Sequence, residues 1–333
     1  MDDSFLHLTW KFSVINHIVI LNIYIYIQNN RCIRNIEKRD NNIEPKGNHI
    51  QKDLPPTDGV NIDIETFLSK LNTSFIGRRI YLYQTVESTQ TIALSLAEQE
   101  TDNLHGTVIV SQHQTKGRGR MGRTWISPAG GIWLSIILKP KIKNSQITVL
   151  PLLSALSVCD VIKKMTKLNA RLKWPNDVVI NGRKVSGILL DLSTKADKID
   201  FVVIGIGVNV NIDIKKINSD IVKSAGFYQI TSLQNELHGK EIEKFDFIRL
   251  LLENIERYIF QIENDGAREI IKKCKKISDT LGKEVIVKQP NEIIQGVAVD
   301  MDENDGFLLI ETPYGCIHKV VSGDVISKNI NEK

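Results

Sequence analysis

A segment rich in glycine and arginine is the part of this chain whose residue types are best suited to chemistry. Residues 117–123 read GRGRMGR, and Thr124 and Trp125 follow. Glycine lets the backbone approach a ligand closely and adopt positive φ angles. The planar guanidinium group of arginine offers several donors that match carboxylate and phosphate oxygens. The segment therefore predicts a loop that closes over an anion, and the alternative is a solvated basic turn.

The same residues match the pattern G-x-G-x-x-G, which raises the question of a dinucleotide-binding loop. That motif needs a strand before it and a helix after it. A strand is expected at 106–113, but residues 125–139 contain Pro128, Gly130 and Gly131 and then the apolar run IWLSIIL. This composition predicts a turn and a strand instead of a helix. The dinucleotide interpretation fails on context, and the absence of G-x-x-x-x-G-K-[ST] from the sequence also excludes a P-loop.

Three further blocks accompany the arginine loop in a fixed order. Glu87–Gln90 (ESTQ) lies upstream, KWPND at 173–177 leads to KVSGILLD at 184–191, and IGIGVNVN at 204–211 comes last. Together the four blocks resemble the biotin protein ligases, and the resemblance covers about 64–327. Gln90 stands where asparagine is usual and Asp191 where glutamate is commoner, but neither exchange removes an acceptor group.

The resemblance implies a two-step acyl transfer with ATP and Mg²⁺. Biotin is first activated as biotinyl-5'-AMP with release of pyrophosphate, and a lysine of a biotin carboxyl carrier protein then accepts the biotinyl group. Two anions must meet in the first step, so preorganised cations and N–H donors are the chemistry required. The resemblance assigns this role to Arg118, Arg120 and Lys184, with Lys184 near the biotin carboxylate.

Two sets of binding residues follow from the resemblance. The biotin set is Ser88, Thr89, Gln90, Gln114, Arg118, Gly119, Arg120, Lys184 and Gly187. The ATP set is Arg120, Arg123, Lys173, Asn176, Asp177 and Asn209, with Asp177 also expected near the metal ion. The ureido ring of biotin is neutral and polar, so it needs fixed neutral partners in an otherwise apolar pocket.

Each of these assignments has a structural alternative. Ser88 and Thr89 could only cap a helix, and Lys184 could be a solvated hairpin lysine beside Arg183. The KWPND string could be a structural turn, because proline interrupts a strand. Gly187 and the pair Gly205 and Gly207 could serve tight strand packing instead of close approach to a ligand.

The elements that must position these residues follow from residue periodicity. Helices are expected at 66–71, from a cap at Ser88 or Thr89 to about 99, and at 149–167, 245–263 and 267–276. Strands are expected at 79–83, 106–113, 131–139, 171–174, 177–180, 184–192 and 201–209. This order predicts an α/β or α+β sheet covered by helices on one side. The resemblance implies that this is the α+β sheet of the biotin/lipoate ligases. Short strands at 284–288, 293–300, 307–311 and 318–321 predict a small C-terminal β-barrel, which resembles the SH3-like domain of these ligases.

Composition limits the partners and the compartment. Net charge is only +4 and scattered, which gives no support for a nucleic-acid partner. The four cysteines, Cys32, Cys159, Cys274 and Cys316, are far apart with no C-x-x-C pair, so a zinc site is not expected. Their spacing also gives no disulfide framework, so a reducing cytoplasm is the expected compartment.

The domain boundaries are expected at 1–62, 63–278 and 279–330. The first segment is an atypical or disordered extension, and its apolar run at 14–27 is shorter than the ~20 residues of a membrane-spanning helix. It shows no pair of amphipathic helices joined by a tight turn, so no DNA-binding repressor domain is expected. The sequence does not give the oligomeric state, although relatives often pair through sheet edges and a homodimer is one of the states that the resemblance allows.

Three other functions remain open at this point. A lipoate–protein ligase has the same fold and adenylate chemistry, but the arginine loop and the KWPND string favour biotin. A biotin-responsive repressor would need the DNA-binding domain that is not expected here. An RNA-binding module could use RGRMGR, but the aromatic residues of single-strand binding are missing from this loop.

Overall fold

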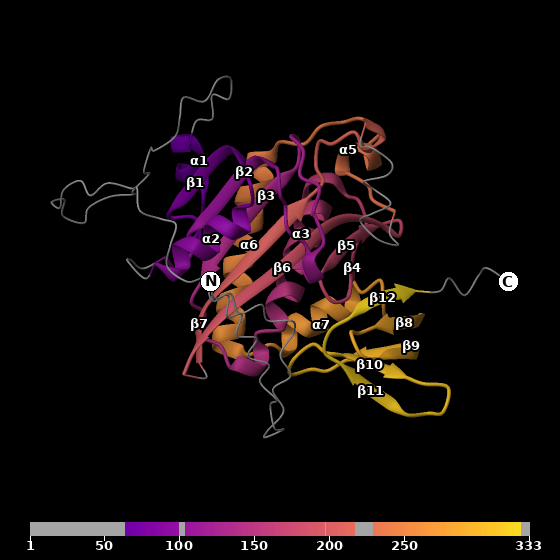
Figure 1. Ribbon diagram of the computed structural model, residues 1–333. Coiled ribbons are helices and arrows are strands. Elements are labelled where there is room, and N and C mark those ends of the chain that lie inside the picture. The colour runs from indigo at the N-terminus through magenta and orange to yellow at the C-terminus, as the bar shows by residue number, and fades with distance from the viewer. Residues whose placement is uncertain (1–63, 100–103, 197, 217–228, 328–333) are drawn as a thin grey trace, which may run out of the picture.

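The computed structural model describes residues 64–99, 104–196, 198–216 and 229–327 (Figure 1). The expected extension at 1–62, including its apolar run, lies outside the described residues. The described chain forms two sheets with helices packed on the larger one. The expected α+β class is thereby confirmed.

The larger sheet has seven strands in the order β1-β2-β3-β7-β6-β5-β4. The strands are β1 (Ile80–Val86), β2 (Val108–Gln114), β3 (Ile132–Leu138), β4 (Ala170–Lys173), β5 (Asp177–Ile180), β6 (Arg183–Lys195) and β7 (Lys198–Val208). Strands β1 and β2 pair in parallel, and the other neighbours pair antiparallel. Asn181 and Gly182, both with positive φ, make the expected tight turn between β5 and β6.

Helices cover both faces of this sheet, although the sequence analysis expected them on one side. On one face lie α3 (Val149–Thr166), α6 (Lys244–Asp265), α7 (Arg268–Lys276) and the short α1 (Ile64–Lys70). Helix α2 (Thr89–Glu98) packs on the opposite face, where Ala93 and Ala97 contact a cluster with Ile109 and Ile137. All seven residues of β3 are buried, which is typical of a strand covered on both faces. The one-sided expectation was therefore wrong.

The smaller sheet has five antiparallel strands in the order β11-β10-β9-β8-β12. They are β8 (Glu284–Lys288), β9 (Ile293–Met301), β10 (Leu308–Glu311), β11 (Ile317–Val320) and β12 (Asp324–Ser327). The first four were expected, whereas β12 was missed. Figure 1 draws this sheet in yellow beside α7, which contacts β9.

One described helical stretch, 144–166, is long and apolar enough to cross a bilayer, but 67% of its window is buried inside the protein. It contains α3, whose apolar residues pack against the sheet and against α6 and α7. Its hydrophobicity is that of a core helix.

Candidate active site

One pocket gathers most of the residues that the sequence identified. Twelve of the fourteen lie in its wall, whereas Lys173 and Asn209 do not. Those in the wall are Ser88, Thr89, Gln90, Gln114, Arg118, Gly119, Arg120, Arg123, Asn176, Asp177, Lys184 and Gly187. The C-terminal sheet also contributes to the wall, through residues 323–325. The motifs are therefore neighbours in space although they are spread over about a hundred positions of the chain.

The arginine loop folds into a compact turn at the pocket rim. The amide of Gly119 donates to the carbonyl of Arg123 at 2.7 Å, and the amide of Trp125 donates to Gly117 at 2.9 Å. Met121 and Gly122 both have positive φ, at 55° and 71°. The sequence predicted this backbone conformation through the glycines, but a methionine also adopts it here.

The three arginines of the loop contact three different parts of the protein. Arg118 lies 3.4 Å from a carboxylate oxygen of Asp191 on β6. Arg120 donates to Oδ1 of Asn176 at 2.7 Å. Arg123 forms an ion pair with Asp324 of β12. The guanidinium groups are thus spread around the pocket by fixed contacts, so the loop places positive charge on several sides of one space.

A buried network of neutral polar groups forms a second wall. Oε1 of Gln114 accepts from the amide of Thr89 at 2.8 Å and from its hydroxyl at 3.1 Å. Nε2 of Gln114 donates to Ser127 at 2.7 Å. Ser135 donates to Gln90 at 2.9 Å, and its hydroxyl lies 2.9 Å from that of Thr89. These bonds fix amide and hydroxyl groups in a place where water is excluded, which suits recognition of an uncharged polar ring.

The side chain of Ser88 does not cap a helix, which was the structural alternative for this residue. It occupies the N-cap position of α2, but its side chain makes no capping hydrogen bond. Its hydroxyl is buried and has no hydrogen-bond partner among the described residues. A buried hydroxyl without a partner is costly, so this group is suited to a bound ligand.

The glycines of β6 and β7 make room for two side chains. A Cβ atom on Gly207 would lie 2.5 Å from Nε1 of Trp125, and one on Gly187 would lie 3.0 Å from the same indole. A Cβ on Gly205 would lie 2.5 Å from Oε1 of Gln90. Packing of pocket side chains therefore accounts for these glycines. The sequence assigned no role to the ring of Trp125, whose only signal is its position directly after the arginine loop.

Lys184 lies in the pocket wall, which contradicts the alternative of a solvated lysine. Its Nζ is 2.7 Å from Oδ1 of Asp177 and 5.1 Å from the centre of the Trp125 ring. The Lys184 side chain is 20% exposed and that of Asp177 is 13% exposed. Backbone bonds to Gln229 and Thr231 hold this lysine from the other side. The ion pair is therefore mostly buried, and each charge depends on the other.

The two remaining residues lie behind the wall. Lys173 is 7% exposed, and its desolvation lowers the pKa of its amine to about 8, against the opposing effect of Asp177 and Asp279. The side-chain amide of Asn209 donates to the carbonyl of Thr231 at 2.9 Å. Asn209 thus supports the segment next to Lys184, and its expected contact with adenine stays a prediction.

Asp324 is a pocket residue that the sequence analysis missed. It begins β12, the strand that was not expected, and its carboxylate reaches Arg123 from the C-terminal sheet. The short string SGD at 322–324 carries no signal that would have singled it out.

Comparison with known proteins agrees with this geometry. The biotin/lipoate A/B protein ligase family matches residues 81–209, and the biotin protein ligase C-terminal domain matches 280–327. The bifunctional ligase/repressor BirA of Bacillus spizizenii is 33% identical over 256 residues, 77% of this chain and 76% of that protein. The biotin–[acetyl-CoA-carboxylase] ligase of Paracoccus denitrificans is 31% identical over 69% of this chain and 92% of its own length.

A solved structure is similar over nearly its whole length. The biotin protein ligase of Aquifex aeolicus, in complex with biotin and ATP, superposes with a TM-score of 0.63 at 32% identity. The match covers 75% of this chain and 98% of that structure. Since sequence, fold and the order of the motifs agree, this chain belongs to the biotin protein ligase family.

Proposed function

We propose that this protein is an ATP-dependent ligase that activates biotin as biotinyl-5'-AMP and transfers it to a lysine of a biotin carboxyl carrier domain. The observation that carries the proposal is the pocket, where the cations of the arginine loop and Lys184 face a buried wall of neutral hydrogen-bonding groups. The Aquifex relative, solved with biotin and ATP, supports the same pair of substrates.

In the proposed mechanism the wall of Thr89, Gln90 and Gln114 holds the ureido ring, and Ser88 adds its hydroxyl. This orientation brings the biotin carboxylate toward Arg118, Arg120 and Lys184, which also attract the α-phosphate of ATP. The cations screen the repulsion between the two anions and stabilise the charge that builds on phosphorus. The carboxylate oxygen attacks phosphorus and pyrophosphate leaves. An acceptor amine then attacks the biotinyl carbonyl, and AMP leaves.

Magnesium would accompany the ATP phosphates. Among the described residues no group of three or more His, Cys, Asp and Glu side chains could hold a metal ion. Mg²⁺ commonly takes one or two carboxylates together with substrate phosphates, and Asp177 and Asp324 lie in the pocket wall. These carboxylates fit that arrangement, in which the ion neutralises phosphate charge.

The acceptor is the carrier domain of a biotin-dependent carboxylase. The name of the Paracoccus relative supports acetyl-CoA carboxylase as the carboxylase class. A homodimer, a cytoplasmic location and the lack of an operator-binding activity are further parts of the proposal. The free thiols of Cys159, Cys274 and Cys316 support a reducing compartment. Specific binding of operator DNA by the purified protein would contradict the proposed lack of operator-binding activity.

Lipoate is the competing substrate, and the buried wall argues against it. The dithiolane ring of lipoate has no N–H or carbonyl group that could satisfy the buried hydroxyl of Ser88, whereas a ureido ring has both. A site built to hydrogen-bond a substrate rejects an analogue that lacks the partner groups. ATP–pyrophosphate exchange measured separately with biotin and with lipoate tests this, and exchange that depends on lipoate alone would overturn the proposal.

The pH dependence of ATP use is the first prediction. Lys173 pairs with Asp177 in the β4–β5 ladder, and its amine is charged only below its lowered pKa of about 8. As the pH rises through that value, the positive charge behind Asp177 is lost and binding of the ATP phosphates weakens. The KM for ATP is expected to rise between pH 7 and 9, while the KM for biotin stays level. Lys173→Arg keeps its charge over this range and should abolish the rise. A KM for ATP that is flat to pH 9 in the unmodified protein would contradict the role.

The proposed domain boundaries yield a second prediction. The catalytic unit at 63–278 and the C-terminal unit at 279–330 contain both sheets and every pocket residue. Deletion of residues 1–62 is therefore expected to leave biotin-dependent exchange within about twofold of the full chain, measured at equal concentrations of active protein. A loss of tenfold or more would make the extension part of the enzyme.

A further inference from the structure

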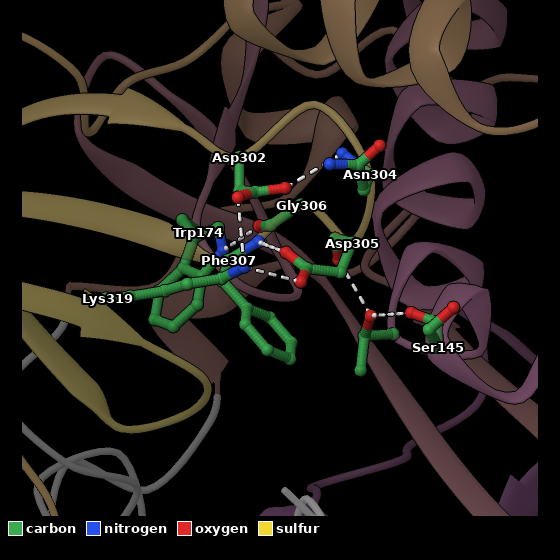
Figure 2. A network of polar contacts seen from close by, with 9 residues as sticks. Ser145, Trp174, Asp302, Asn304, Asp305, Gly306, Phe307 and Lys319 are labelled. Atoms are coloured by element: carbon green, nitrogen blue, oxygen red, sulfur yellow. Dashed lines mark hydrogen bonds and ion pairs between the residues drawn. The ribbon is translucent and has the colours of Figure 1, made fainter. Parts of the chain in front are cut away.

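A turn of the C-terminal sheet, residues 302–307, is stabilised by hydrogen bonds between its own residues and by ion pairs with a lysine (Figure 2). We call it the acidic turn. The amide of Asn304 donates to the Asp302 carboxylate at 2.9 Å, and that of Phe307 donates to the Asp305 carboxylate at 3.1 Å. Nζ of Lys319, on β11, lies 2.9 Å from Asp302 and 2.7 Å from Asp305. The lysine lies between the two carboxylates and links Asp302, at the start of the turn, to Asp305 within it.

The acidic turn presents two backbone carbonyls to the larger sheet and its helices. The carbonyl of Asp305 accepts from the hydroxyl of Thr148, at the start of α3, at 2.7 Å. The carbonyl of Gly306 accepts from the indole N–H of Trp174 at 3.0 Å. A Cβ on Gly306 would lie 2.5 Å from Leu152, so the turn sits directly against α3. Figure 2 shows Gly306 beside Trp174 within this network.

Trp174 connects the acidic turn to the pocket. It is 3% exposed and lines the pocket, and its own amide donates to Thr280 at 3.0 Å. Asn176, which accepts from Arg120, lies two positions later. Asp177, which pairs with Lys184, follows directly. The path from Lys319 to the arginine loop therefore runs through the indole of Trp174.

We propose that the acidic turn is a positioning element of the adenylation site, and that Trp174 is the positioning residue through which it holds Asn176 and Asp177. The inference rests on the proposed function. It concerns the ATP side of the pocket, because β4 and β5 lie at the opposite edge of the sheet from β1 and β2. The wall assigned to the ureido ring is built on α2, β2 and β3.

The test compares Trp174→Phe with Lys319→Met in the full chain. The first keeps an aromatic ring and removes only the indole donor, and the second removes the brace at a distance from the pocket. Each variant is expected to raise the KM for ATP in biotin-dependent exchange by about threefold to tenfold, the effect of one lost hydrogen bond. The KM for biotin, and the Kd for biotin measured by calorimetry without ATP, are expected to stay unchanged. The KM for ATP of the double variant should be no higher than that of the more impaired single variant, because both substitutions act on one path.

The matched control is Lys272→Met, which removes another lysine from an exposed ion pair, that with Glu269 on α7. It is expected to leave both KM values unchanged. Equal rises in the KM for ATP and for biotin would indicate general loosening and overturn the inference, as would an unchanged KM for ATP in Lys319→Met. If Trp174→Phe fails to fold, the KM for ATP of Lys319→Met alone tests the inference. Failure of the unmodified protein to exchange with biotin would instead count against the proposed function.

Discussion

Arg120→Ala is expected to lower biotin-dependent pyrophosphate exchange by about 100-fold to 1000-fold, the usual cost of removing one donor to a developing anion. Arg120 lies in the pocket wall and is held toward it by Asn176. In the proposed mechanism its guanidinium spans the biotin carboxylate and the α-phosphate, so alanine removes the charge where the two anions meet. The fold should persist, because the side chain is not part of either core cluster.

The adenylate formed by Arg120→Ala should also leave the enzyme faster. A loop that closes over the mixed anhydride keeps water from it, and this closure depends on contacts with the ligand. Radiolabelled biotinyl-AMP that stays with the protein through rapid gel filtration measures the effect. Lys116→Ala is the matched control, because Lys116 lies at the base of the loop in an exposed pair with Glu87. Retention of adenylate at the level of the unmodified protein would remove the loop from the mechanism.

Most of the pocket could be predicted because its residues sit in short strings at the ends of strands. ESTQ follows β1, the arginine loop follows β2, and KWPND joins β4 to β5. Strands β1 and β2 are parallel neighbours, so ESTQ and the arginine loop lie at the same end of the sheet. KWPND reaches the same pocket because Asp177 pairs with Gly187, which in turn pairs with Gly207. The order of the motifs therefore carried spatial information that composition alone does not contain.

The missed features depend on contacts between distant segments. The position of α2 on the second face follows from apolar side chains on both sides of β2 and β3, and a helix alone does not reveal which face it covers. Strand β12 is held by its pairing with β8, and Asp324 enters the pocket only through that pairing. Lys173 and Asn209 were assigned to the nucleotide by motif; neither lines the pocket, and their assignment stays a prediction.

The glycines of β6 and β7 lie in the pocket region as expected, but the reason for their small size differs from the one considered first. Gly187 and Gly207 stand where close approach to a ligand was one interpretation, and the indole of Trp125 fills that space instead. The buried N–H of Trp125 has no acceptor among the described residues. Since a buried donor without an acceptor costs free energy, a ligand oxygen that reaches this indole would gain a hydrogen bond.

Lys184→Gln is expected to lower exchange by about 100-fold or more and also to destabilise the protein. The substitution removes a cation from the pocket and leaves Asp177 mostly buried without its partner. Removal of one partner from a buried ion pair costs about 3–5 kcal/mol and less from a partly exposed pair, which should appear as a fall of several degrees in the thermal midpoint. The loss of activity alone would therefore not separate catalysis from structure.

The double variant Lys184→Gln, Asp177→Asn separates the two effects. Two neutral amides can hydrogen-bond to each other, so the thermal midpoint should return toward that of the unmodified protein. Exchange should remain about 100-fold lower, because the ammonium group of Lys184 no longer faces the biotin carboxylate. Lys184→Arg keeps the charge, but its planar fork does not replace a compact ammonium group, so it should recover only part of the activity. Recovery of exchange in the double variant would mean that Lys184 serves only to neutralise Asp177, and the catalytic role would then fall to the arginine loop alone.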